Sequence, residues 1–150
     1  MSEPQRPRVE GYTFEGLDWQ QIPGAPWVDD AMGLVVDLLS PDRVEGHLEA
    51  GPQHHQPYGI VRGGVYCSMV ETLASIAAAT RVLVDGKVCV GVNNTTDFLR
   101  PTRTGRLTGV ATPLHVGRLQ HLWEVEITRD DDKVAARGQV RLQVLDADRF

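Results

Sequence analysis

The stretch GPQHHQPYGIVRGGVYCSMVETLASIAAATR, from Gly51 to Arg81, decides the fold. Its first half, up to Gly64, is rich in glycine, proline and histidine, which predicts an irregular loop. Its second half is small and apolar at helical spacing and contains no proline, which predicts a helix over residues 63–84. Because this helix is apolar nearly all round, we expect it to lie buried in the core.

One charged residue, Glu71, interrupts the helix between residues 65 and 80. A carboxylate in an apolar helix is unfavourable unless it has a partner or a function, so Glu71 is a candidate catalytic residue. Gly63 and Gly64 leave backbone N–H groups at the positive end of the helix, where an anion or a developing oxyanion is stabilised. The alternative is that Glu71 lies on a hydrated stripe of the helix, and the residues alone leave both interpretations open.

The motif that joins this loop to the helix resembles the signature of the hot-dog acyl-CoA thioesterases, closest to the phenylacetic-acid-degradation (PaaI-like) and hydroxybenzoyl-CoA thioesterase branch. The motif reads His55-x-Pro57-x-Gly59-x-x-Arg62-Gly63-Gly64, followed by Glu71. The resemblance continues through residues 97–101 (DFLRP) and 115–118 (HVGR), and it covers about residues 30–145. It implies an α+β hot-dog fold, in which an antiparallel sheet wraps around one long central helix.

The pattern outside the helix favours the same class independently. Alternating apolar and polar residues predict strands over residues 32–39, 43–50, 87–99, 106–116, 119–128 and 133–145. Gly91, inside one of these strands, predicts a bulge or a close approach of the helix. One helix covers only one face of a sheet, and sheet edges need cover, so we expect self-association. The resemblance implies a homodimer with a continuous sheet, often paired again into a homotetramer.

Length and composition set the remaining limits. A chain of 150 residues predicts one domain, here an irregular N-terminal arm over residues 1–26 and a hot-dog thioesterase domain over 27–150. The absence of a long apolar run or a signal-peptide pattern predicts a cytoplasmic protein without a membrane span. The net charge of −5 argues against nucleic-acid binding. The two cysteines, Cys67 and Cys89, lack metal-site spacing, so we expect reduced, buried thiols and no metal.

The chemistry implied by the resemblance is hydrolysis of an acyl-CoA thioester, with coenzyme A as part of the substrate and no separate cofactor. Glu71 would act as nucleophile or as general base on water, and the sequence does not separate these roles. The N–H of Gly63 or Gly64 would hold the oxyanion. The hydroxybenzoyl-CoA branch has an amide side chain six positions before the His-Gly motif and a hydroxyl one turn after the glutamate. Gln56 and Ser75 hold these positions.

Two further loop residues belong to the predicted catalytic set. Arg62 stands where the family usually has histidine, and it is permanently charged. If Arg62 lies near Glu71, it keeps that carboxylate ionised, which suits a nucleophile or a base. His55 is either a catalytic residue or a structural hydrogen-bonding group of the loop. Because His54 is adjacent to it, the two side chains should point in opposite directions.

Substrate binding is assigned to residues beyond the helix. Arginine forms bidentate contacts with phosphate, so Arg100, Arg103, Arg106 and Arg118 are candidates for the phosphates of coenzyme A. The turn Gly117-Arg118 best matches the family's CoA-contacting turn. We also expect Asn94 and Thr95 to line the acyl pocket from a partner subunit.

Two alternative functions remain open from the sequence. The first is a hot-dog dehydratase or hydratase acting on acyl thioesters, in which His55 would pair with the carboxylate. The second is a non-catalytic module that binds acyl-CoA, which the replacement of histidine by Arg62 keeps open.

Overall fold

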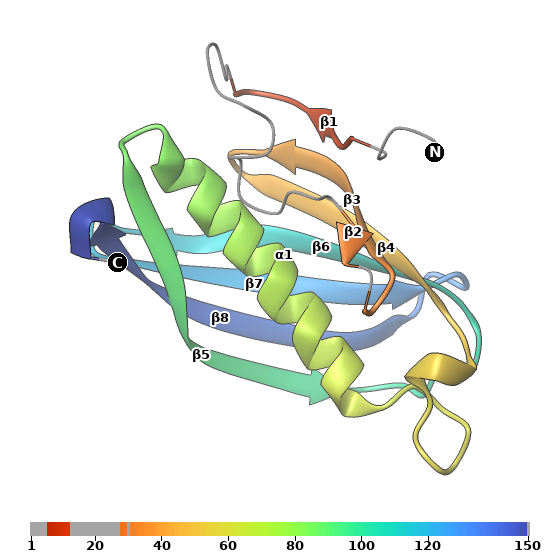
Figure 1. Ribbon diagram of the computed structural model, residues 1–150. Coiled ribbons are helices and arrows are strands. Elements are labelled where there is room, and N and C mark those ends of the chain that lie inside the picture. Colours follow the sequence, from red (N-terminus) through yellow and green to blue (C-terminus); the bar gives the residue numbers. More distant parts are fainter. Residues whose placement is uncertain (1–5, 13–27, 30, 150) are drawn as a thin grey trace.

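A curved antiparallel sheet packed around one long helix forms the body of the protein in the computed structural model, which describes residues 6–12, 28–29 and 31–149 (Figure 1). The elements are β1 (Arg8–Val9), β2 (Val28–Asp29), β3 (Leu34–Ser40), β4 (Arg43–Ala50), the 3₁₀ turn η2 (Pro52–His54), α1 (Gly63–Leu83), β5 (Lys87–Phe98), β6 (Gly105–Val116), β7 (Gln120–Arg129), β8 (Val134–Asp146) and the 3₁₀ turn η3 (Ala147–Arg149). The predicted α+β class is confirmed.

The strands follow the order β1-β3-β4-β6-β7-β8-β5, with β2 paired to β3 outside this path. Every pairing is antiparallel except that of β1 with β3. The six strands and the helix predicted from the sequence are all present. β1 is a two-residue strand within the predicted N-terminal arm, most of which lies outside the described residues.

The first predicted strand begins two residues later than expected, at Leu34 instead of Met32. Gly33 adopts a φ of 75°, a left-handed conformation that a regular strand does not contain. The chain therefore turns before it enters the sheet. The other boundaries agree with the expectation to within one or two residues.

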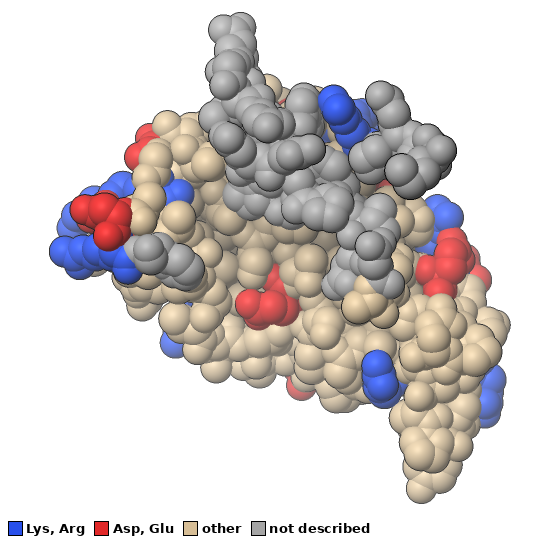
Figure 2. All heavy atoms as spheres, viewed as in Figure 1, with Lys and Arg blue, Asp and Glu red and all other residues tan. Residues whose placement is uncertain are grey.

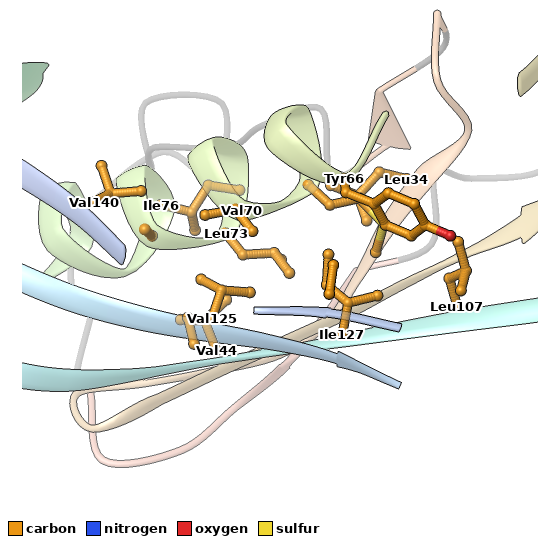
Figure 3. Packing of buried hydrophobic residues seen from close by; sticks show 14 of the residues in the cluster. Leu34, Val44, Tyr66, Val70, Leu73, Ile76, Leu107, Val125, Ile127 and Val140 are labelled. Carbon is orange, nitrogen blue, oxygen red and sulfur yellow. The ribbon is translucent and has the colours of Figure 1, made fainter. Parts of the chain in front are cut away.

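The core lies between α1 and the concave face of the sheet, where Val70, Leu73 and Ile76 of the helix meet Val125 and Ile127 of β7 (Figure 3). Glycines in the sheet allow this close approach. A Cβ atom at Gly109 would lie 2.5 Å from Cδ1 of Leu73, and one at Gly46 would lie 2.9 Å from its Cδ2. Leu73 therefore fills space that side chains on β4 and β6 would otherwise occupy.

β5 forms the free edge of the sheet and runs beside α1 (Figure 1). Among the described strands it pairs with β8 alone, and none of its residues is fully buried. Val92 and Phe98 are 56% and 55% exposed. This long, partly apolar edge has the properties of a strand that pairs with another chain. Cys67 and Cys89 are free thiols of intermediate burial, so the expectation of buried thiols is met only in part.

Candidate active site

Glu71 lies in the middle of α1, half-buried, on the side of the helix that faces β5. Its Oε1 accepts a hydrogen bond of 3.2 Å from the Ser75 hydroxyl, and its Oε2 accepts one of 3.4 Å from Nδ2 of Asn94. The predicted shared face of positions 71 and 75 is therefore present. Figure 2 shows acidic atoms over the middle of α1, with uncharged atoms around them.

Gly91 of β5 lies directly against this carboxylate. A Cβ atom at Gly91 would lie 2.4 Å from Oε1 of Glu71, so a residue with a side chain at position 91 would displace the carboxylate. The expected bulge is also present, because the pairing with β8 shifts register between Gly91 and Asn93. Gly91 thus has both features that the sequence predicted as alternatives, a bulge and a close approach of the helix.

The loop before α1 is held by its histidines. The His54 ring is buried: its Nδ1 accepts from the N–H of Gly51, so its Nε2 donates to the carbonyl of Met32, at 2.7 Å. Nε2 of His55 lies 2.5 Å from the carbonyl of Arg103 and donates to it. The two rings thus point to different parts of the molecule, and the contacts of His55 fit the structural alternative.

A pocket of about 420 Å³ opens at the start of α1. Gln56 and Gly63 both line it, as do the rings of Tyr66 and Phe98. Oε1 of Gln56 accepts from the N–H of Tyr58, which leaves its NH₂ group as the donor available for a ligand. Phe98 packs on Gly63 so closely that a Cβ there would lie 2.5 Å from the ring. The remaining lining residues are Ile60, Val61, Leu99, Arg100 and Pro101.

Gly64 faces a different and smaller pocket, of about 220 Å³, which Arg62 and Ser68 also line. The side chain of Arg62, the N-cap residue, makes no capping hydrogen bond to α1. The first backbone N–H groups of a helix have no partner within it. The two glycines line two separate pockets, and Gly63 is the one that shares a pocket with Gln56.

Glu71 and this helix start are far apart within one chain. Glu71 is eight positions after Gly63, which corresponds to about 12 Å along the helix axis. Arg62 is one residue further away, and no ion pair joins it to Glu71 among the described residues. The condition for Arg62 to keep Glu71 ionised, that Arg62 lies near Glu71, is therefore not met within a single chain.

The arginines predicted to bind coenzyme A divide into two groups. Arg100 and Arg103 lie near the start of α1, where Arg100 donates to the carbonyl of Val134 and Arg103 to that of Gly59. The turn Gly117-Arg118 follows the far end of β6, and the twelve residues of that strand span roughly 35 Å. A single chain therefore does not bring these residues together.

Two other predicted residues have internal partners. Arg106 forms an ion pair of 2.6 Å with Glu49 on the neighbouring strand. Thr95 donates its hydroxyl to Oδ1 of Asn93, at 3.2 Å, whereas Asn94 faces α1. The strand alternation places Thr95 on the face opposite to Asn94.

Sequence reasoning missed the aromatic side chains of the larger pocket. Tyr66 was assigned only to the apolar helix, and Phe98 only to the DFLRP segment. Their rings lie 5.9 Å apart between centroids. Burial raises the pKa of the Tyr66 phenol, so the hydroxyl stays protonated at neutral pH. The only sequence signal was the pair of small residues at 63–64, which leaves room for an aromatic ring but does not indicate which residue supplies it.

The structure also limits other kinds of site. Within residues 6–12, 28–29 and 31–149, no group of three or more histidine, cysteine or acidic side chains is arranged to hold a metal ion. No helix in the described part of the chain is both long and apolar enough to cross a membrane.

Comparisons of sequence and of structure with known proteins identify the same family. The sequence profile of the thioesterase superfamily matches residues 58–136. A Mycobacterium tuberculosis protein named "Putative esterase Rv1847" is 49% identical over 121 residues, which cover 79% of this chain and 86% of the relative. The solved structure of that esterase superposes with a TM-score of 0.78 at 50% identity, over 79% of this chain and 96% of the other.

Two further solved structures have the same architecture. Thioesterase HI1161 from Haemophilus influenzae is 29% identical with a TM-score of 0.73, over 77% of this chain and 80% of the other. The Escherichia coli PaaI protein from the phenylacetic acid degradation operon is 22% identical with a TM-score of 0.71, over 77% and 81%. The second likeness shows the fold alone, and it agrees with the hot-dog fold expected from the sequence.

Proposed function

The chain belongs to the thioesterase superfamily, and we propose that it hydrolyses an acyl-CoA thioester to the free acid and coenzyme A, with Glu71 as the catalytic carboxylate. The observation that carries this proposal is the position of Glu71. It is the only acidic residue of a mostly apolar helix, and its carboxylate accepts hydrogen bonds from Ser75 and Asn94 beside the β5 edge of the sheet. A carboxylate fixed in this way suits a nucleophile or a general base.

The oxyanion would form at the helix start. Gly63 lines the same pocket as Gln56, so we assign the oxyanion contact to the N–H of Gly63 in preference to that of Gly64. A donor of this kind lowers the activation barrier by about 3 kcal/mol. Gln56 would orient the thioester or the attacking water through its NH₂ group.

The separation of about 12 Å along α1 means that these two halves do not act on one thioester within one chain. We propose that a second copy pairs along β5, so that Glu71 of one chain meets Gly63 and Gln56 of the other. A two-fold axis through this edge makes two equivalent sites. The resemblance-based expectations of a homodimer, and of a tetramer built from it, belong to this proposal.

Coenzyme A would lie with its phosphates against arginines near the pocket, with Arg100 as a lining residue and Arg103 beside it. A thioesterase from Streptococcus pneumoniae, 15% identical with a TM-score of 0.69, was solved with coenzyme A. The proposal includes no cofactor beyond the coenzyme A of the substrate. It also includes a cytoplasmic location, which suits free cysteines.

The contacts of His55 favour the thioesterase over the dehydratase alternative. Its Nε2 donates to the carbonyl of Arg103, which engages this nitrogen in the structure of the loop. The non-catalytic binding module differs from the thioesterase in one measurable respect. It would raise the melting temperature with CoA esters and release no thiol.

The direct test is release of free thiol from a panel of acyl-CoA esters of different size. Glu71→Gln should lower kcat by about 10²-fold to 10⁴-fold with the fold intact. Glu124→Gln is the matched control, because Glu124 lies on β7, paired with Gln139 of β8 and away from α1. Equal activity of the Glu71→Gln protein and the control would remove Glu71 from the site.

Mixed oligomers test the two-chain site. Refolding equal amounts of Glu71→Gln and Gln56→Ala chains should restore about a quarter of wild-type activity if the dimer is the active unit, because half of the dimers are mixed and each has one intact site. No recovery would show that both residues act within one chain.

A further inference from the structure

Asn94 has a place in the structure that its predicted role in substrate binding does not explain. Its Nδ2 donates to the carbonyl of Cys67, at 3.0 Å, and to Oε2 of Glu71, at 3.4 Å. Cys67 is one helical turn before Glu71 on α1. The amide of Asn94 therefore joins the edge strand β5 to the helix at the position of the acid.

The orientation of this amide follows from its partners. Thr96 donates its hydroxyl to Oδ1 of Asn94, at 2.7 Å, so that oxygen is an acceptor. The NH₂ group must then point to the two oxygen acceptors on α1. Gly138 on β8 leaves room for Thr96, because a Cβ there would lie 2.6 Å from its hydroxyl oxygen. Thr96 thus fixes the amide in the orientation that contacts Glu71.

The bulge in β5 makes this contact available. Gly91 pairs with Leu142 and Asn93 pairs with Arg141, which leaves Val92 without a partner. An extra residue in one strand shifts the later side chains to the opposite face. Without the bulge, Asn93 would continue the helix-facing row of Gly91. With it, Asn94 and Thr96 face α1.

We propose that Asn94 is a positioning residue, which holds the Glu71 carboxylate in its reactive orientation and is itself held by Thr96. This rests on the proposed function. Ser75 donates to Oε1 and Asn94 to Oε2, so each carboxylate oxygen has one donor from the chain. Gly91 limits the space on the strand side. A carboxylate has about four acceptor sites, which leaves capacity for water or a thioester.

Kinetics separate this role from a role in binding. Asn94→Ala should lower kcat by about 10-fold to 100-fold with KM unchanged within about twofold, because a misplaced reacting group slows the chemical step. Asn94→Asp keeps the shape and replaces the donor by an acceptor, so its loss should be at least as large. Thr96→Val should lower kcat by a smaller factor, about threefold to tenfold, and Thr96→Ser should restore it.

The matched control is Asn93→Ala, which removes the neighbouring amide on the other face of β5. It should retain kcat within about twofold. The proposal is overturned if Asn94→Ala and Asn93→Ala have the same kcat. It is also overturned if Asn94→Ala raises KM alone, because Asn94 would then contact substrate directly.

A crystal structure of the Asn94→Ala protein gives a readout that does not depend on activity. The Glu71 side chain should turn away from β5 in this variant and stay in place in Asn93→Ala. An unchanged Glu71 overturns the positioning role. If the wild-type protein releases no thiol from any CoA ester, the proposed function fails, and the Glu71 position in these two crystals still decides the role of Asn94.

Discussion

Gly91→Ala is the substitution whose effect on Glu71 follows most directly from the geometry. The added Cβ would lie 2.4 Å from Oε1, whereas ordinary contact begins at 3.4 Å. The carboxylate must therefore move by the difference, about 1 Å. A displacement of this size in a reacting group costs about 10²-fold in rate, which equals about 2.7 kcal/mol of activation free energy.

Folding should not suffer from the same change. Gly91 is not among the residues with positive φ, so alanine adopts its backbone conformation without strain. Glycine weakens a strand interior, and β5 is exposed around this position. We therefore expect a melting temperature equal to or slightly above that of the wild type, with kcat for thiol release reduced about 100-fold.

Val90→Ile is the control for Gly91→Ala, because it adds one methyl group to the adjacent residue, on the opposite face of β5. It should keep kcat within about twofold. Shortening the acid gives a second check. In a Glu71→Asp background, Gly91→Ala should reduce kcat by a much smaller factor, because the shorter side chain avoids the clash. A Gly91→Ala enzyme with wild-type kcat would refute the reasoning, because the carboxylate would then not need its observed position.

Three further predictions concern the edge, a thiol and the core. Val92→Lys places a charge on the unpaired β5 edge, so light scattering should show a shift to monomers together with loss of activity, and an active oligomer would contradict the proposed pairing. Burial raises the pKa of the Cys89 thiol to about 11, so at pH 8 roughly one molecule in a thousand carries the thiolate. Iodoacetamide should therefore modify Cys89 far more slowly in the folded protein than in the unfolded chain, and faster as the pH rises. Equal modification rates of Cys89 in the folded and unfolded protein would contradict this. Leu73→Ala should lower the free energy of unfolding by about 2–5 kcal/mol in urea titrations, because Leu73 is fully buried against sheet glycines. A loss below about 1 kcal/mol would contradict this, because it would show that neighbouring side chains fill the cavity.

Much of the fold and part of the site could be predicted from local pattern. Alternation of apolar residues located six strands, and the apolar run after Gly64 located α1. Glu71 and Ser75 were placed together correctly because helical spacing alone puts residues four apart on one face. The contact between Asn94 and Glu71 could not be predicted, because β5 and α1 approach each other through packing that no local pattern describes.

The sequence by itself determined the element types, the acid on the central helix and the glycines before it, since these depend on periodicity and on the chemistry of single residues. Tertiary structure alone decided which side chains meet that acid. One unpaired residue, Val92, reverses the facing of the rest of β5, and the pairing with β8 decides where that reversal falls. Because α1 is one continuous helix packed against the sheet, it holds Glu71 about 12 Å from the helix start.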